Sequence, residues 1–243
     1  MRVFAVLHRS LRLLVGLAVL AAIAAALLWA IRTRPQDLPG TALDLGQPIG
    51  LFTGRKLSGL TQDRAQCLAL LDQAGIEYRA LDPHGEGECR VDDQVRLSRA
   101  PPIGIALAPG DVAPSCPVVA ALAMWEWNVV QPEALRLLGS KVARIEHFGS
   151  YSCRRMGGRG PWSEHATADA IDVAAFVLDD GRRVSVVGDW SGDDAEAAFL
   201  RAVRNGACDL YATVLSPDYN AAHADHFHLD QAYRGAMGWR GCF

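Results

Sequence analysis

The chain lacks a CxxC pair, a visible internal repeat and, beyond its first 34 residues, any excess of basic charge. Without a CxxC pair, a structural zinc site built from thiolates is not expected. Residues 1–34 hold five arginines and no acid, so the remainder carries 19 basic against 27 acidic residues, a net charge of −8. Nucleic acid and anionic lipid both attract basic surfaces, so neither is an expected partner of this part of the chain.

The composition is that of a globular protein. The chain has 243 residues, half of them hydrophobic, which is enough for one domain with a substantial core and some additional segments. Nothing in the composition indicates a collagen, a coiled coil or a disordered chain.

An uncharged apolar run separates the N-terminus from the rest. Residues 13–31 are 19 Leu, Ala, Val, Ile, Gly and Trp residues, about the length that spans a bilayer as a helix. Two interpretations stay open. We favour a retained anchor, because the run is long and is followed by Arg32 and Arg34, but a cleaved signal peptide also fits the alanine-rich stretch. Either one exports the rest of the chain, and the basic start favours a cytoplasmic N-terminus.

The predicted organisation follows from this run. We expect an inner-membrane protein with one span and its C-terminal domain in the periplasm, or, if the helix is cleaved, a secreted domain. Residues 1–12 are predicted to form a cytoplasmic tail, residues 13–31 the anchor and residues 32–50 a tether. The domain is predicted over residues 51–243, with a small N-terminal extension at 51–100 and a core at 101–243 that carries the metal site.

Six cysteines all follow the apolar run. An even number of cysteines in an exported chain predicts three disulfides, although small buried thiols would give the same pattern. Neighbouring cysteines often close local loops, and on that basis the expected pairs are Cys67–Cys89, Cys116–Cys153 and Cys208–Cys242.

Hydrophobic patterning predicts an α+β fold in which an antiparallel sheet is flanked by helices. Gly149 to Glu164 has the composition of a long loop, and long loops in compact domains are often functional. The predicted helices run from a Thr61 cap to Gly75, over Val118–Val130 with further turns at Pro132–Leu138, and from a Ser191 cap to Gly206. The predicted strands are Ile76–Tyr78, Cys89–Val91, Val142–Phe148, the hairpin Ala170–Leu178 and Arg183–Val187, Tyr211–Leu215 and Phe227–Leu229.

Four of the seven histidines fall in two short segments, 163–172 and 223–230. On a strand, His226 and His228 leave the same face, while Phe227 between them faces the core. Catalytic zinc commonly takes three nitrogen or oxygen ligands and keeps a position for water, so His165, Asp172 and His228 can form such a set.

Both segments resemble the motifs of a known group of enzymes. Ser163-x-His165-x-x-Ala168-x-Ala170-x-Asp172 is similar to the SxHxxGxAxD motif of the zinc D-Ala-D-Ala peptidases and their lysostaphin-like relatives. His223-x-x-His226-x-His228 resembles the second motif of the murein endopeptidases in that group. The chain from about 51 to 243 most resembles bacterial extensin-like C-terminal domain proteins, on the stretches 150–155, 163–166, 170–173 and 225–230.

The resemblance implies a fold like that of the zinc D-Ala-D-Ala peptidases and a role for each matching residue. Zn²⁺ would be bound by His165, Asp172 and His228. The base or transition-state stabiliser would be His226 or Asp225, and His223 would position the substrate or share the proton transfer. Arg154 or Arg155 would hold a substrate carboxylate or an oxyanion. The sequence departs from the pattern at Ala168, which replaces a glycine and would be strained at positive φ, and in lacking the glutamate that several of these peptidases use as base.

Three functions are compatible with these features to different degrees. The expected function is a membrane-anchored, periplasmic zinc-dependent peptidase that acts on peptidoglycan peptides. The alternative is a non-catalytic module that binds the cell wall or a protein and retains the peptidase-like pocket. A disulfide-rich structural protein with incidental histidines is disfavoured by the spacing of the two segments.

Overall fold

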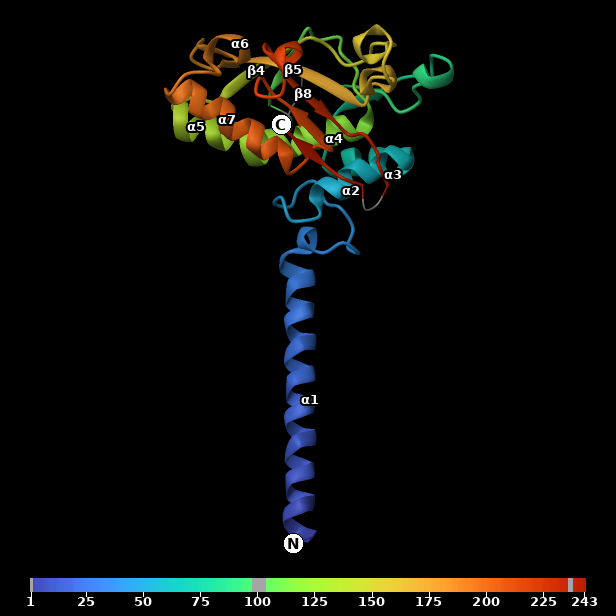
Figure 1. The fold of residues 1–243 in the computed structure, drawn as a ribbon, viewed down its shortest axis with the longest axis vertical. Helices are drawn as coiled ribbons and strands as arrows, with labels where there is room; N and C mark the ends of the chain where they lie inside the picture. Colours follow the sequence, from blue (N-terminus) through green and yellow to red (C-terminus); the bar gives the residue numbers. More distant parts are fainter. Residues whose placement is uncertain (1, 98–103, 236–237) are drawn as a thin grey trace.

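The N-terminal helix stands apart from the rest of the molecule. A computed structural model describes residues 2–97, 104–235 and 238–243, and in it α1 (Arg2–Thr33) extends away from the domain (Figure 1). Between His8 and Thr33 the most apolar stretch of this helix reaches a mean hydropathy of 2.7, and the side chains are exposed apart from a half-buried Ala30. A helix satisfies its own backbone hydrogen bonds, so α1 is compatible with one membrane span or with a signal sequence.

The chain joins the domain soon after α1. A 3₁₀ turn, η1 (Pro35–Asp37), follows, and Leu43 and Leu45 are already part of the hydrophobic core, 5% and 2% exposed. Next come α2 (Thr53–Gly59), η2 (Leu60–Gln62) and α3 (Arg64–Gln73), which pack against the later helix α4. The domain boundaries given above stay predictions.

A different residue from the one expected caps α3. Asp63 accepts a hydrogen bond from the backbone of Gln66, whereas Thr61 lies within η2 and its hydroxyl donates to the Ser58 carbonyl. Aspartate is among the strongest N-caps, which explains the shifted start. Gly75 adopts a φ of 71° just after the helix, as expected of a C-terminal glycine.

The main sheet has seven strands and a mixed arrangement. Its order is β3-β4-β5-β8-β7-β9, with β6 paired to β5, and its central pairs are antiparallel as predicted. The expectation fails at both edges, because β3 runs parallel to β4 and β9 parallel to β7. A parallel pair needs a long crossover, and the helices between β3 and β4 supply one. The strands are β3 (Ala106–Ala108), β4 (Val142–His147), β5 (Ala170–Leu178), β6 (Arg183–Ser185), β7 (Thr213–Leu215), β8 (Phe227–Asp230) and β9 (Gly241–Cys242).

A second, two-stranded sheet differs from its prediction. It pairs β1 (Tyr78–Ala80) with β2 (Val95–Leu97) in antiparallel register. No strand forms at Cys89–Val91. Cys89 ends a 3₁₀ turn, η3 (Gly87–Cys89), and Val91 forms only an isolated bridge with His84. The ladder forms further along the chain, where Val95 is fully buried.

Three helices cover one side of the main sheet (Figure 1). They are α4 (Cys116–Trp125), α5 (Gln131–Leu138) and α7 (Ala195–Cys208), and a short α6 (Val186–Asp189) follows β6. The helix expected over Val118–Val130 is interrupted by a π-helical segment, η4 (Glu126–Val130). Trp125 joins the layers, since its indole donates to the Val203 carbonyl at 2.8 Å and its ring meets that of Phe176 edge-on.

Helix α7 starts and ends later than predicted. Asp194, not Ser191, caps it by accepting from the backbone of Ala197 at 2.9 Å. Gly206 does not end the helix. A Cβ at this position would lie 2.4 Å from Val129, so the glycine permits close helix packing instead.

Three disulfides form, and two of the predicted pairings are wrong. The bonds are Cys67–Cys116, Cys89–Cys153 and Cys208–Cys242. Only Cys208–Cys242 was expected. Cys67 lies on the buried face of α3, which packs on α4 where Cys116 begins the helix. Cys89 lies beside the long loop, whose Tyr151 hydroxyl donates to the Cys89 carbonyl. Tertiary packing, not proximity in sequence, therefore selects these pairs, and the disulfides indicate an oxidising, non-cytoplasmic location for the domain.

Candidate metal centre

Two neighbouring strands bring the first two candidate ligands together. Asp172 on β5 and His228 on β8 lie directly opposite each other in the antiparallel register. Their neighbours Ile171 and Leu229 are completely buried in the core. Since side chains alternate along a strand, Asp172 and His228 project from the face opposite the helices. A one-residue slip would bury both of them in the core, so the hydrophobic pattern fixes the site.

A β-bulge keeps Asp172 on this face while the same strand also supplies the core. On β5, Val173 pairs with His147 and Ala175 with Glu146, so Ala174 is the extra residue. The bulge changes which positions of β5 face the core. Before the bulge Val173 faces the core, and after it Phe176 faces the core, where its ring contacts that of Trp125. Bulges next to functional sites commonly re-aim side chains in this way.

His165 reaches the same point from the long loop. It lies in a 3₁₀ turn, η6 (Glu164–Thr167), whose cap Ser163 accepts from the His165 backbone. Its Nδ1–H donates to the Ser150 carbonyl at 2.5 Å, a partner that assigns the tautomer and leaves Nε2 facing the cluster. The turn closes at Ala168, which is fully buried and has a φ of 61°, the only positive φ of a non-glycine residue in the described part of the chain. The expected strain at Ala168 is therefore present.

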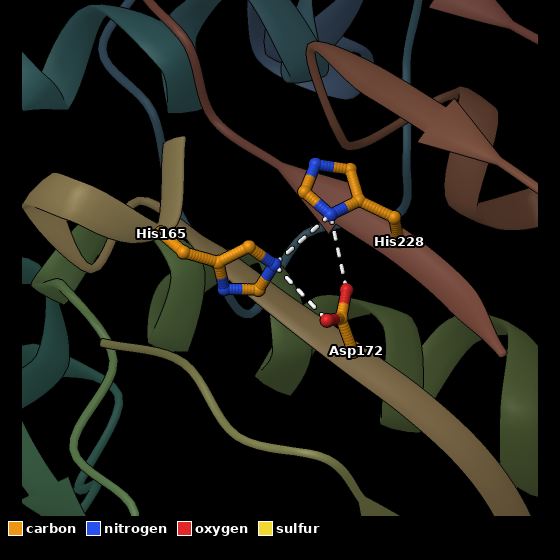
Figure 2. Close-up of side chains that lie close together, drawn as sticks. All are labelled: His165, Asp172 and His228. Atoms are coloured by element: carbon orange, nitrogen blue, oxygen red, sulfur yellow. Dashed lines mark hydrogen bonds and ion pairs between the residues drawn. The ribbon is translucent and has the colours of Figure 1, made fainter. Parts of the chain in front are cut away.

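The three candidate ligands form a compact triangle (Figure 2). His165 Nε2 lies 3.2 Å from His228 Nδ1 and 3.1 Å from Asp172 Oδ2, and His228 Nδ1 lies 3.0 Å from Asp172 Oδ1. A tetrahedral zinc ion with bonds of about 2.0–2.1 Å separates its ligand atoms by about 3.3–3.4 Å. The residues thus fit such an ion with a few tenths of an ångström of expansion.

Asp230 completes the support of His228 and was missed by the sequence analysis. His228 Nε2 donates to Asp230 Oδ2 at 3.3 Å, which directs Nδ1 toward Asp172 and His165. A histidine ligand of a metal commonly makes this kind of second hydrogen bond to a carboxylate. The signal was available, because residues 228 and 230 share one face of a strand.

The electrostatics of the triangle favour a bound cation. Burial lowers the pKa of His228, but hydrogen bonds to Asp172 and Asp230 outweigh it and raise the pKa to about 9. Burial raises the pKa of Asp172, but its hydrogen bonds to His165 and His228 hold that pKa well below its usual range. The negative charge of Asp172 between two imidazoles can be balanced by a protonated histidine or by a bound metal ion. Protons and a metal ion would therefore compete for this site.

Two further histidines lie at the edge of the triangle. His226 Nδ1–H donates to Asp225 at 2.8 Å, so Nε2 points inward, 3.5 Å from Asp172 Oδ1. His223, in η7 (Ala221–His223), donates from Nδ1 to the side-chain oxygen of Asn220 at 2.9 Å. Burial, followed by the charges of His226 and His228, lowers the pKa of His223 to about 4, so it is neutral at physiological pH.

A family model described as Extensin-like protein C-terminus matches residues 65–242, a span that contains all of these side chains. The chain belongs to this family. No curated protein and no solved structure matches it.

In this extensin-like protein the triangle opens into a cavity of about 530 Å³. Arg154 lines the cavity, as expected for a substrate-binding residue, but Arg155 does not. Arg155 stacks on the Trp162 ring at 4.5 Å and donates to the Gly160 carbonyl. The structure thus separates two arginines that the sequence could not distinguish.

The cavity is also lined by residues that were not predicted from the sequence. Arg234 stacks on Trp239 at 4.4 Å, and both line the cavity. Its rim holds four exposed apolar side chains, a type that elsewhere marks binding surfaces. They are Met156, Tyr219, Trp239 and Phe243.

Proposed function

We propose that this extensin-like protein is a zinc-dependent peptidase that acts on peptidoglycan peptides. The observation that carries the proposal is the buried triangle of His165, Asp172 and His228 at the floor of a cavity wide enough for a peptide. The likeness to zinc D-Ala-D-Ala peptidases rests on the two histidine motifs and is part of the proposal. The α1 helix would hold the protein in the inner membrane with the domain in the periplasm, which agrees with the basic start and the disulfides.

His165, Asp172 and His228 would hold the zinc ion. A zinc ion bound there would supply Lewis-acid polarisation of the amide carbonyl and a nucleophilic water molecule. His226 Nε2 would accept a proton during the reaction, and Asp225, which accepts from Nδ1–H, would stabilise the resulting imidazolium.

The remaining residues position the substrate. Neutral His223 offers Nε2 as an acceptor for a substrate N–H, because its Nδ1–H is already donated to Asn220. Arg154 presents a planar fork of donors that suits a substrate carboxylate or the developing oxyanion. The apolar rim excludes water from the peptide once it is bound.

The zinc content of the full-length protein in detergent tests this proposal. The wild type should hold about one zinc ion per chain, His228→Ala should lose it, and His8→Ala should keep it, because His8 lies on α1 far from the site. A wild type without zinc after reconstitution contradicts the proposal.

Incubation with muropeptides then separates enzyme from binding module. New products detected by mass spectrometry and absent with His228→Ala support peptidase activity. Tight muropeptide binding without products supports the non-catalytic alternative, which shares the same pocket and rim.

A further inference from the structure

A second cavity of about 380 Å³ lies next to the metal cavity. The two share a wall. Phe148 lines the second cavity while its ring meets that of His226 edge-on at 5.6 Å. Ser150 also lines the second cavity, and its carbonyl accepts from His165. Phe148 and Ser150 therefore line the second cavity while they contact His226 and His165 of the metal cavity.

Two charges of opposite sign line this second cavity without pairing. Arg96, on β2, and Asp111, on the segment after β3, form no ion pair with each other or with any residue in the described ranges. Arg96 also faces Arg79 across the β1–β2 ladder, and like charges directly opposite each other destabilise a hairpin. Its Nε is buried without a hydrogen-bond partner. Departures of this kind from local rules are expected where a ligand supplies the missing partner.

Two buried polar side chains on the same walls are also incompletely satisfied. Gln94 is 5% exposed, and its amide nitrogen donates to the Ala113 carbonyl at 2.6 Å, whereas its oxygen has no partner among the described residues. His147 is 6% exposed and is hydrogen-bonded through Nε2 to the Pro109 carbonyl, whereas its Nδ1 has no partner there. Both side chains line the same cavity as Arg96 and Asp111.

We propose that the second cavity binds a zwitterionic amino-acid group, an ammonium and a carboxylate on one carbon. Arg96 holds the carboxylate with its planar fork, and Asp111 holds the ammonium. A simple anion would be repelled by Asp111 and a simple cation by Arg96, so only a ligand with both charges satisfies both side chains.

The inference rests on the proposed function in one respect, which is the identity of the ligand. Peptidoglycan stem peptides can carry a diamino acid whose far end has a free ammonium and carboxylate. With that end in the second cavity, the peptide crosses Phe148 and places its backbone over His165, Asp172 and His228. The second cavity would then select the substrate, and the metal cavity would act on it.

Calorimetric titration of the full-length protein in detergent with meso-diaminopimelate tests the inference. Pimelate has the two carboxylates without the amines, and cadaverine has the amines without the carboxylates. Diaminopimelate should bind at least about tenfold more tightly than either of them. Equal binding of the three compounds, or no binding of diaminopimelate, overturns the inference.

The variants locate the binding. Arg96→Gln and Asp111→Asn should each weaken diaminopimelate binding about tenfold or more. Arg79→Gln removes the same charge directly across the ladder but outside the cavity, and it should bind as the wild type does. An equal loss in Arg79→Gln would show a general charge effect and refute the site. Asp111 is exposed, so its variant remains informative if Arg96→Gln fails to fold.

Diaminopimelate binding to the second cavity should not depend on whether the metal cavity binds zinc. His228→Ala should lose zinc but keep diaminopimelate binding, because His228 does not line the second cavity. A wild type that lacks zinc but binds diaminopimelate through Arg96 would refute the peptidase proposal alone. A zinc-loaded protein in which Arg96→Gln has no effect would refute the second cavity alone.

Discussion

Glu126 predicts a specific pH dependence of stability. It begins the π-helical segment η4, is 4% exposed, and accepts backbone hydrogen bonds from Gly104 at 2.8 Å and Ile105 at 3.1 Å. Burial raises its pKa from 4.5 to about 7, and these hydrogen bonds only partly oppose the shift. Between pH 4.5 and 7 the folded state therefore keeps a proton that the unfolded state releases, so the free energy of unfolding falls as the pH rises through this range.

The size of the effect follows from linkage. Each pKa unit corresponds to about 1.4 kcal/mol, so the raised pKa of Glu126 costs about 3 kcal/mol of folding free energy at pH 8 and about 1 kcal/mol at pH 5. Glu126→Gln keeps an oxygen that can accept from Gly104 and Ile105 but cannot ionise. Any fixed packing cost of the amide is the same at both pH values. Relative to the wild type, the variant should therefore gain about 2 kcal/mol between pH 5 and pH 8.

Urea unfolding of the full-length protein, followed by tryptophan fluorescence with the disulfides intact, measures this difference. Glu77→Gln serves as the control, since it removes an exposed glutamate before β1 and should show no such gain. If Glu126→Gln differs from the wild type by the same amount at pH 5 and pH 8, the burial argument is wrong.

Three further predictions concern the metal centre. Asp230→Asn should weaken zinc binding about 10- to 100-fold, as measured by competition with a chelator, because His228 loses its carboxylate partner. His226→Ala should retain zinc but lower muropeptide turnover about 10²- to 10⁴-fold, whereas zinc loss would make it a ligand instead. Cys89→Ser should weaken zinc binding more than Cys208→Ser, since only the first frees the loop that carries His165; equal losses would contradict this role of the loop.

Part of the candidate metal centre could be predicted because it follows local rules. Strand periodicity predicted that His228 projects from the face opposite Phe227, whereas Asp172 was marked by the spacing of the motif that contains His165. The strained backbone at Ala168 was predictable from the resemblance, because glycine usually occupies this position of the motif. The α+β class and the central antiparallel strands also followed from patterning.

What the sequence did not reveal depends on tertiary contacts. The Ser150 carbonyl that orients His165 belongs to a loop whose path no local pattern specifies. Two disulfide pairings were predicted wrongly for the same reason. Cys89 pairs with Cys153, a residue of that loop, and the two cysteines are 64 residues apart in the sequence. The bulge at Ala174 lets one strand serve both the site and the core. Nothing in the strand's sequence marks it, because its nine residues are apolar or small except for Asp172. The second cavity joins segments from three regions of the chain and carries no motif.

The short connection between α1 and the domain sets how far the domain can travel. Core packing begins at Leu43, so only residues 34–42 separate the helix from the folded body, and η1 already shortens them. Fully extended, these nine residues would span about 30 Å. With α1 embedded in a bilayer, the metal centre would therefore stay in a thin layer above the membrane surface and could not diffuse through the compartment. Its encounters would then be restricted to molecules that come close to the membrane surface.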